Sequence, residues 1–176
     1  YNWNGTNSTL YNDSLVLMMN FDNVSAIGEN STYAVDVSGY GNNGTFTGCD
    51  ADTGWTASGK YSGGLMFDGA GDVLTLGTSM PSMTSWTLAA WAKTTNLDSS
   101  NQIIISNDRS GWNDDVLFGI EPDDSETGNI DNTWGITHQD KTSQVRTIVN
   151  DDGVAIENTW YYVVATSNAT HLKLYI

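Results

Sequence analysis

The feature that most restricts the fold of this chain is the spacing of its apolar residues. They occur in short runs, often alternating with polar residues, and the runs are separated by segments rich in Asn, Asp, Ser and Gly. In residues 86–93 (WTLAAWAK), one face would carry Trp86, Leu88, Ala90 and Ala92, and the other Thr87, Ala89, Trp91 and Lys93. No segment has a sustained 3.6-residue period, so we expect at most a turn or two of helix. The spacing therefore predicts an all-β protein.

Many short strands in one chain of 176 residues predict a two-sheet antiparallel sandwich. We expect residues 1–14 to be a lead-in or linker and residues 15–176 to be one domain. Residues 65–68 and 73–76 flank a Gly-Ala-Gly segment and are expected to form a hairpin. The other expected strands are 15–21, 33–37, 45–47, 86–93, 103–106, 116–120, 134–138, 145–149, 160–166 and 172–176.

The charge of the chain limits its possible partners. Six Lys and Arg face 21 Asp and Glu, which gives a net charge of −15. Nucleic-acid binding needs clustered Lys and Arg, so we do not expect a nucleic acid as a partner. The acidity suits Ca²⁺, but solubility or a high-salt habitat is the favoured explanation for most of the charge. No apolar stretch is long enough to span a bilayer, so we expect no membrane insertion.

The sequons favour an exported protein, and the cysteine content does not oppose it. The lone Cys49 can form no internal disulfide, which argues against a small disulfide-rich domain but not against a secreted prokaryotic one. Seven N-x-S/T sequons make N-glycosylation a candidate modification, six of them within the first 45 residues. They lie at Asn4, Asn7, Asn12, Asn23, Asn30, Asn43 and Asn168. We therefore expect an extracellular or cell-surface location.

Several stretches, taken in order, resemble one known family. They are residues 15–22 (LVLMMNFD), 35–46 (VDVSGYGNNGTF), 60–73 (KYSGGLMFDGAGDV), 86–93 (WTLAAWAK) and 158–175 (NTWYYVVATSNATHLKLY). Together they resemble the laminin-G-like jelly-roll domains of the concanavalin A-like lectin/glucanase superfamily. The resemblance implies a two-sheet antiparallel jelly-roll sandwich. In that family the strand that corresponds to residues 172–176 leads into further closing strands. The domain is therefore expected to be a fragment, or to be completed by another segment or subunit.

The resemblance also implies a structural Ca²⁺ near the opening strand and the Gly-rich loop. The corresponding positions here are Asp22, Asp36, Asn42 and Asn43. Carboxylate, amide and backbone oxygens converging there would supply several of the ligands that Ca²⁺ takes. In the alternative interpretation, Asp36 caps a turn and Asn42 and Asn43 supply turn geometry only.

Sugar binding on a β-sandwich calls for an exposed aromatic ring beside planar polar groups. Trp112, with Asn113 and Asp114, lies in a polar loop and is the first candidate for carbohydrate binding, and Trp55 is the second. In the favoured alternative, Trp112 is a loop anchor that packs on the sheet. Trp86, Trp134 and Trp160 are expected in the core.

Catalysis is not expected. Residues 121–126 (EPDDSE) match the E-x-D-x-x-E spacing of some glycanases, but Pro122 would interrupt a strand and the segment is typical of an acidic surface loop. Two main functions stay open. The first is a non-catalytic surface module that binds carbohydrate or mediates adhesion. The second is a structural subunit or decoration of an extracellular filament, tube or layer, assembled with other surface proteins or copies of itself. A glycan hydrolase is a minor alternative.

Overall fold

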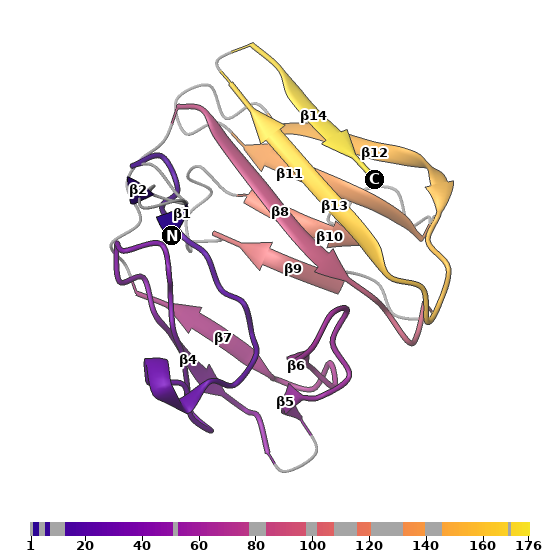
Figure 1. The fold of residues 1–176 in the computed structure, drawn as a ribbon. Coiled ribbons are helices and arrows are strands. Elements are labelled where there is room, and N and C mark those ends of the chain that lie inside the picture. The colour runs from indigo at the N-terminus through magenta and orange to yellow at the C-terminus, as the bar shows by residue number, and fades with distance from the viewer. Residues whose placement is uncertain are drawn as a thin grey trace. The chain divides into compact units, whose positions relative to one another are not determined.

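The computed structural model describes residues 2–3, 6–7, 13–50, 53–77, 84–97, 102–107, 116–120, 132–139, 146–168 and 170–176. These residues form fourteen strands and one turn of 3₁₀ helix, Ser25–Ile27 (Figure 1). Every strand pairing is antiparallel. The chain divides into two compact units, Tyr1–Ser82 and Met83–Ile176. The prediction of an all-β protein is confirmed.

The unit Met83–Ile176 contains two sheets. The first has the order β12-β11-β10-β9, formed by Arg146–Val154, Thr133–Gln139, Val116–Ile120 and Gln102–Ser106. The second has the order β14-β13-β8, formed by Leu172–Tyr175, Tyr161–Ser167 and Trp86–Ala92. Figure 1 shows β8, β13 and β14 lying across the strands of the first sheet.

A shared apolar core joins these two sheets. Phe118 and Trp134 come from the first sheet and Val163 from the second, and all three are almost completely buried. Full burial of one such side chain contributes about 1.5–3 kcal/mol to the hydrophobic free energy of folding. On β8, Trp86, Leu88, Ala90 and Ala92 pack against this core, as their alternation predicts. The unit is thus a two-sheet antiparallel sandwich.

The unit Tyr1–Ser82 is built from smaller sheets. One sheet has the order β3-β4-β7, formed by Tyr33–Ala34, Gly44–Thr47 and Val73–Leu76. A second pairs β5 (Gly54–Thr56) with β6 (Gly64–Met66). The strands β1 (Asn2–Trp3) and β2 (Thr6–Asn7) form a third pair within the segment expected to be a linker.

The expected strand at residues 15–21 is wrong. Among the described residues, this segment pairs with no strand. Its backbone is bonded to the loop that follows β3: Met18 N–H donates to the Asp36 carboxylate at 2.9 Å, and Met18 C=O accepts from Val37 N–H at 2.8 Å. Asn42 Nδ2 donates to Val16 C=O at 2.7 Å. The side chains of Asp36 and Asn42 thus take several of the backbone hydrogen bonds that a neighbouring strand would otherwise form. The expected strand at 33–37 is shorter in the structure, Tyr33–Ala34, because its second half belongs to the same loop.

The expected hairpin of residues 65–68 and 73–76 is also wrong. Both strands exist, but β6 pairs with β5 and β7 pairs with β4. Between them, Gly69 and Gly71 adopt positive φ values of 79° and 102°. The loop therefore separates two sheets instead of closing one hairpin. The more distant β4 pairs with β7, and β6 pairs with the strand before it, β5, which the sequence pattern does not predict.

Candidate functional site

The first group of interest surrounds the carboxylate of Asp36, which is 6% exposed. One oxygen accepts the N–H groups of Met18 and Ser38, both at 2.9 Å. The other accepts Ser38 Oγ at 2.8 Å and Asn42 N–H at 2.9 Å. Burial by itself raises the pKa of Asp36, but these hydrogen bonds outweigh burial and hold the pKa below its ordinary value. The Asp36 carboxylate therefore accepts hydrogen bonds from the backbone at three positions, Met18, Ser38 and Asn42.

The predicted calcium ligands are only partly brought together. Asn42 and Asn43 lie with Asp36, and the Asn43 Oδ1 accepts the Asp36 N–H at 2.8 Å. Asp22 instead bonds to Gly63 and shares no hydrogen-bond partner with Asp36. The Asp36 and Asn43 oxygens already accept N–H and O–H donors, so as arranged here they do not fit a calcium site. No group of three or more His, Cys, Asp or Glu suited to a metal occurs in the part of the chain that the structure describes. Calcium binding stays a prediction.

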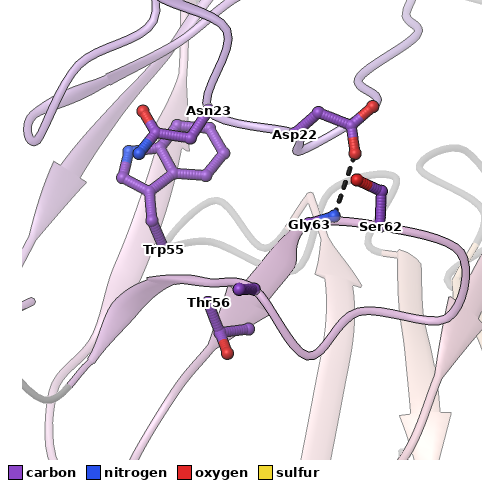
Figure 2. Close-up of a pocket in the computed structure, with 7 residues that line it drawn as sticks. Asp22, Asn23, Trp55, Thr56, Ser62 and Gly63 are labelled. Carbon is purple, nitrogen blue, oxygen red and sulfur yellow. Dashed lines mark hydrogen bonds between the residues drawn. The ribbon is translucent and has the colours of Figure 1, made fainter.

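A second group lines a surface hollow of about 310 Å³ in the unit Tyr1–Ser82. Asp22, Asn23, Trp55, Thr56, Ala57, Ser62 and Gly63 form its wall (Figure 2). In Figure 2 the Ser62 side chain lies beside the Asp22 carboxylate, and Asn23 and Trp55 line the hollow with them. The hollow thus combines an aromatic ring with carboxylate, amide and hydroxyl groups. We call it the Trp55 hollow.

Three contacts fix the Trp55 ring in place. Its Nε1–H donates to the Asn30 backbone oxygen at 2.8 Å. Phe46 meets it edge-on, with ring centroids 5.3 Å apart, and Phe21 lies 6.5 Å away at a tilt of 57°. The polar edge of the indole is therefore satisfied within the protein, and the half-buried ring is held in a defined position in the wall of the hollow.

The backbone around Asp22 is unusual. Phe21 and Asn23 both adopt left-handed conformations, with φ of 57° and 55°. Such conformations cost of order 1 kcal/mol in residues other than glycine, and they cluster at functional sites. One oxygen of exposed Asp22 accepts the Gly63 N–H at 3.0 Å, and the other has no partner among the described residues. The two left-handed residues thus present a carboxylate oxygen that is free to accept a further hydrogen bond.

Gly63 allows this close approach. A Cβ atom at this position would lie 2.6 Å from the Phe21 backbone oxygen and 2.8 Å from the Asp22 Cα. Only glycine lets the loop that precedes β6 pass so near the Asp22 segment. Gly59 N–H bonds to Ser62 C=O at 2.9 Å and closes the turn of that loop.

Comparison with known proteins gives one match. Residues 67–176, well over half of the chain, match the family Laminin_G_3, described as the concanavalin A-like lectin/glucanases superfamily. The chain belongs to this superfamily. No curated protein and no solved structure matches it.

Membership of the concanavalin A-like superfamily confirms the predicted jelly-roll sandwich and the resemblance stated from the sequence motifs. The match begins at Phe67, so it includes the motifs of β8, β13 and β14 but not the Trp55 hollow or the Asp36 loop. The lectin-like superfamily is compatible with binding of carbohydrate or protein and with an extracellular location. No helix among the described residues has the length and apolar character needed to cross a membrane.

The remaining predicted site residues have separate outcomes. Trp112, Asn113 and Asp114 lie outside the described residues, as does the acidic segment 121–126. Asn23, Asn30 and Asn168 are exposed and Asn43 is half-buried. Asn4 and Asn12 lie outside the described residues, and Asn7 lies in β2. Glycosylation stays a prediction at every sequon.

Of the hollow's residues, the sequence pointed to Trp55 as a sugar candidate, Asp22 as a metal ligand and Asn23 as a sequon. It missed Thr56, Ser62 and Gly63, which are ordinary loop residues by composition. The spacing Gly59-x-x-x-Gly63 was the available signal, since paired glycines mark places where backbones approach closely.

Proposed function

We propose that this chain is a non-catalytic carbohydrate-recognition module of an extracellular or cell-surface protein. The observation that carries the proposal is the Trp55 hollow, whose lining includes an indole ring, a carboxylate, an amide and the Ser62 hydroxyl. Aromatic rings stack on the C–H faces of sugar rings, and carboxylate and amide groups bond to sugar hydroxyls. Superfamily membership supports the same class of ligand.

The size and charge of the hollow restrict the ligand further. A volume of about 310 Å³ lies at the lower end of the range for small-molecule sites, so it suits one or two sugar rings. Asp22 supplies an anionic acceptor on a chain of net charge −15. We therefore expect a neutral sugar that donates hydroxyl hydrogens to Asp22.

Glycan-array screening followed by calorimetric titration of the strongest ligand tests this function. Asp22→Ala removes the free carboxylate oxygen, and we expect the affinity to fall about tenfold or more, since a hydrogen bond to a charged group contributes about 1.5–3 kcal/mol. Trp55→Phe keeps part of the aromatic packing but narrows the ring, and it should also weaken binding. The matched control is Asp68→Ala, which removes an exposed aspartate in a turn outside the hollow.

The protein for this test should come from a host that adds no glycan. Asn23 is itself a sequon and lines the hollow, so a glycan on it would compete with a ligand for the same space. Binding that survives Asp22→Ala and Trp55→Phe unchanged, or no binding to any glycan, would rule out the Trp55 hollow as a lectin site.

A second candidate function is assembly through a sheet edge. Within the described residues, β14 pairs only with β13, so one side of its backbone has no strand beside it. Such an edge can accept a strand from another chain. Electron microscopy of the purified chain at high concentration distinguishes this candidate: ordered polymers support it, and a monodisperse monomer contradicts it.

A further inference from the structure

The outward face of the sheet β14-β13-β8 carries a row of exposed aromatic residues. Alternate residues of these strands pack on the core, so their neighbours in sequence point away from it. Trp91, Tyr162 and Tyr175 are 38%, 48% and 52% exposed. We define the aromatic strip as Trp91, Lys93, Trp160, Tyr162, Lys173 and Tyr175.

The strand register orders the strip into four rows. Trp91 lies opposite Tyr162, with ring centroids 5.2 Å apart. Beyond this pair, the Lys93 Nζ lies 5.2 Å from the centre of the Trp160 ring. This contact is also a correction, because Trp160 was expected in the core and is instead half-buried under a lysine.

The other two rows continue in the opposite direction. Tyr175 lies opposite Val164, and Lys173 lies opposite Thr166. Successive rows are two residues apart, or about 6.7 Å along a strand, so the four rows span roughly 20 Å. The strip therefore extends about 20 Å in the direction of the strands, with a lysine in each end row and aromatic rings in the first three rows.

The charge of the strip is opposite to that of the chain. The chain has six Lys and Arg against 21 Asp and Glu, yet two of the six lie here. The outward positions of β8, β13 and β14 contain no Asp or Glu. Neither Lys93 nor Lys173 forms an ion pair with a described residue, and both are exposed. Both ammonium groups thus remain available to an anion outside the chain.

We propose that the aromatic strip binds a linear polysaccharide that contains uronic acids. Aromatic rings spaced along the direction of the strands suit the C–H faces of consecutive sugar rings, and the two lysines suit carboxylates at intervals along the polymer. Two lysines in about 20 Å give a low charge density. This density matches a carboxylated chain better than a densely sulfated one. The site is separate from the Trp55 hollow and does not depend on it.

The binding test uses the full chain at 0.15 M salt, where repulsion from distant acidic groups is screened beyond about 8 Å. Oligogalacturonates of increasing length are titrated and Trp fluorescence is followed. The affinity should rise with length until the oligomer covers the strip. The fully methyl-esterified oligomers keep the rings but lose the charge, and they should bind more weakly.

Variants separate the contributions of charge and stacking. Lys93→Gln with Lys173→Gln should lower the affinity about tenfold or more, which is about 1.4 kcal/mol. Lys60→Gln, a cation in the other unit, is the matched control for net charge and should change the affinity less than about twofold. Tyr162→Ala removes a half-exposed ring and should weaken binding. Because the ring also contacts Trp91, thermal melts must first show that the variant is fully folded at the temperature of the titration. Trp55→Phe should leave this binding unchanged. A failure of the proposal for the Trp55 hollow can therefore be distinguished from a failure of the proposal for the aromatic strip.

Several results would overturn the proposal. Binding of the acid oligomers that is unaffected by the lysine and Tyr162 variants would place the ligand elsewhere. Dextran sulfate or polyglutamate that binds equally well, with no loss in Tyr162→Ala, would show a simple cationic surface. Self-association of the chain that Tyr162→Ala abolishes would identify a second copy as the occupant.

Discussion

Replacement of Asp36 by Asn tests whether one buried anion organises the loop after β3. The substitution keeps the size and shape of the side chain but turns one oxygen into an amide group. In the favourable orientation, the remaining oxygen still accepts the Met18 and Ser38 N–H groups. The new amide then faces the Asn42 N–H, so two donors meet and one buried backbone N–H loses its acceptor.

The expected loss of stability follows from these contacts. An unpaired buried N–H costs about 1–3 kcal/mol, and the remaining hydrogen bonds lose the strength that a charged acceptor gives them. Together these effects predict a fall of about 2–4 kcal/mol in the free energy of unfolding at pH 7. Asp68→Asn is the matched control. Asp68 is exposed in a turn, and the same change there should cost less than about 1 kcal/mol.

Urea denaturation followed by Trp fluorescence measures this difference as a function of pH. The folded state lowers the pKa of Asp36, so its contribution is complete above the unfolded pKa of about 3.9 and is lost as the pH falls through the lower folded value. The gap between wild type and Asp36→Asn should therefore be largest near neutrality and shrink below about pH 4. Equal stabilities at pH 7, or a gap that persists unchanged in acid, would refute the role assigned to this carboxylate.

Two further predictions follow from the same unit. Gly63→Ala should destabilise the chain by about 1–3 kcal/mol, because its Cβ would meet the backbone of Phe21 and Asp22. Gly77→Ala, where a Cβ meets nothing within 4 Å, should be nearly neutral in the same thermal melts, and equal effects would contradict the close approach. EDTA should leave the melting temperature unchanged, because the Asp36 oxygens are already bonded to protein donors. A fall of several degrees that added Ca²⁺ reverses would show that the predicted ligands do gather around a metal.

The sequence by itself determined the class of fold and much of its strand order. The two-residue alternation in residues 86–93 is sufficient to identify both faces of β8, because a strand must place alternate side chains on opposite sides. Local turn residues likewise located β10, β11, β13 and β14 to within a residue or two. These features depend on local chemistry, which a sequence displays directly.

Tertiary structure decided which segments pair and which side chains meet. The apolar run at 15–21 predicts a strand, but its backbone bonds to the side chains of Asp36 and Asn42. Asn42 lies 26 positions from its partner Val16. The Trp55 hollow joins residues separated by about forty positions, and its formation depends on the absence of a side chain at Gly63. The aromatic strip depends on the register that sets Trp91 opposite Tyr162 and Val164 opposite Tyr175. Long-range pairing is chosen by the combined burial and hydrogen bonding of distant segments, and no local pattern contains that information.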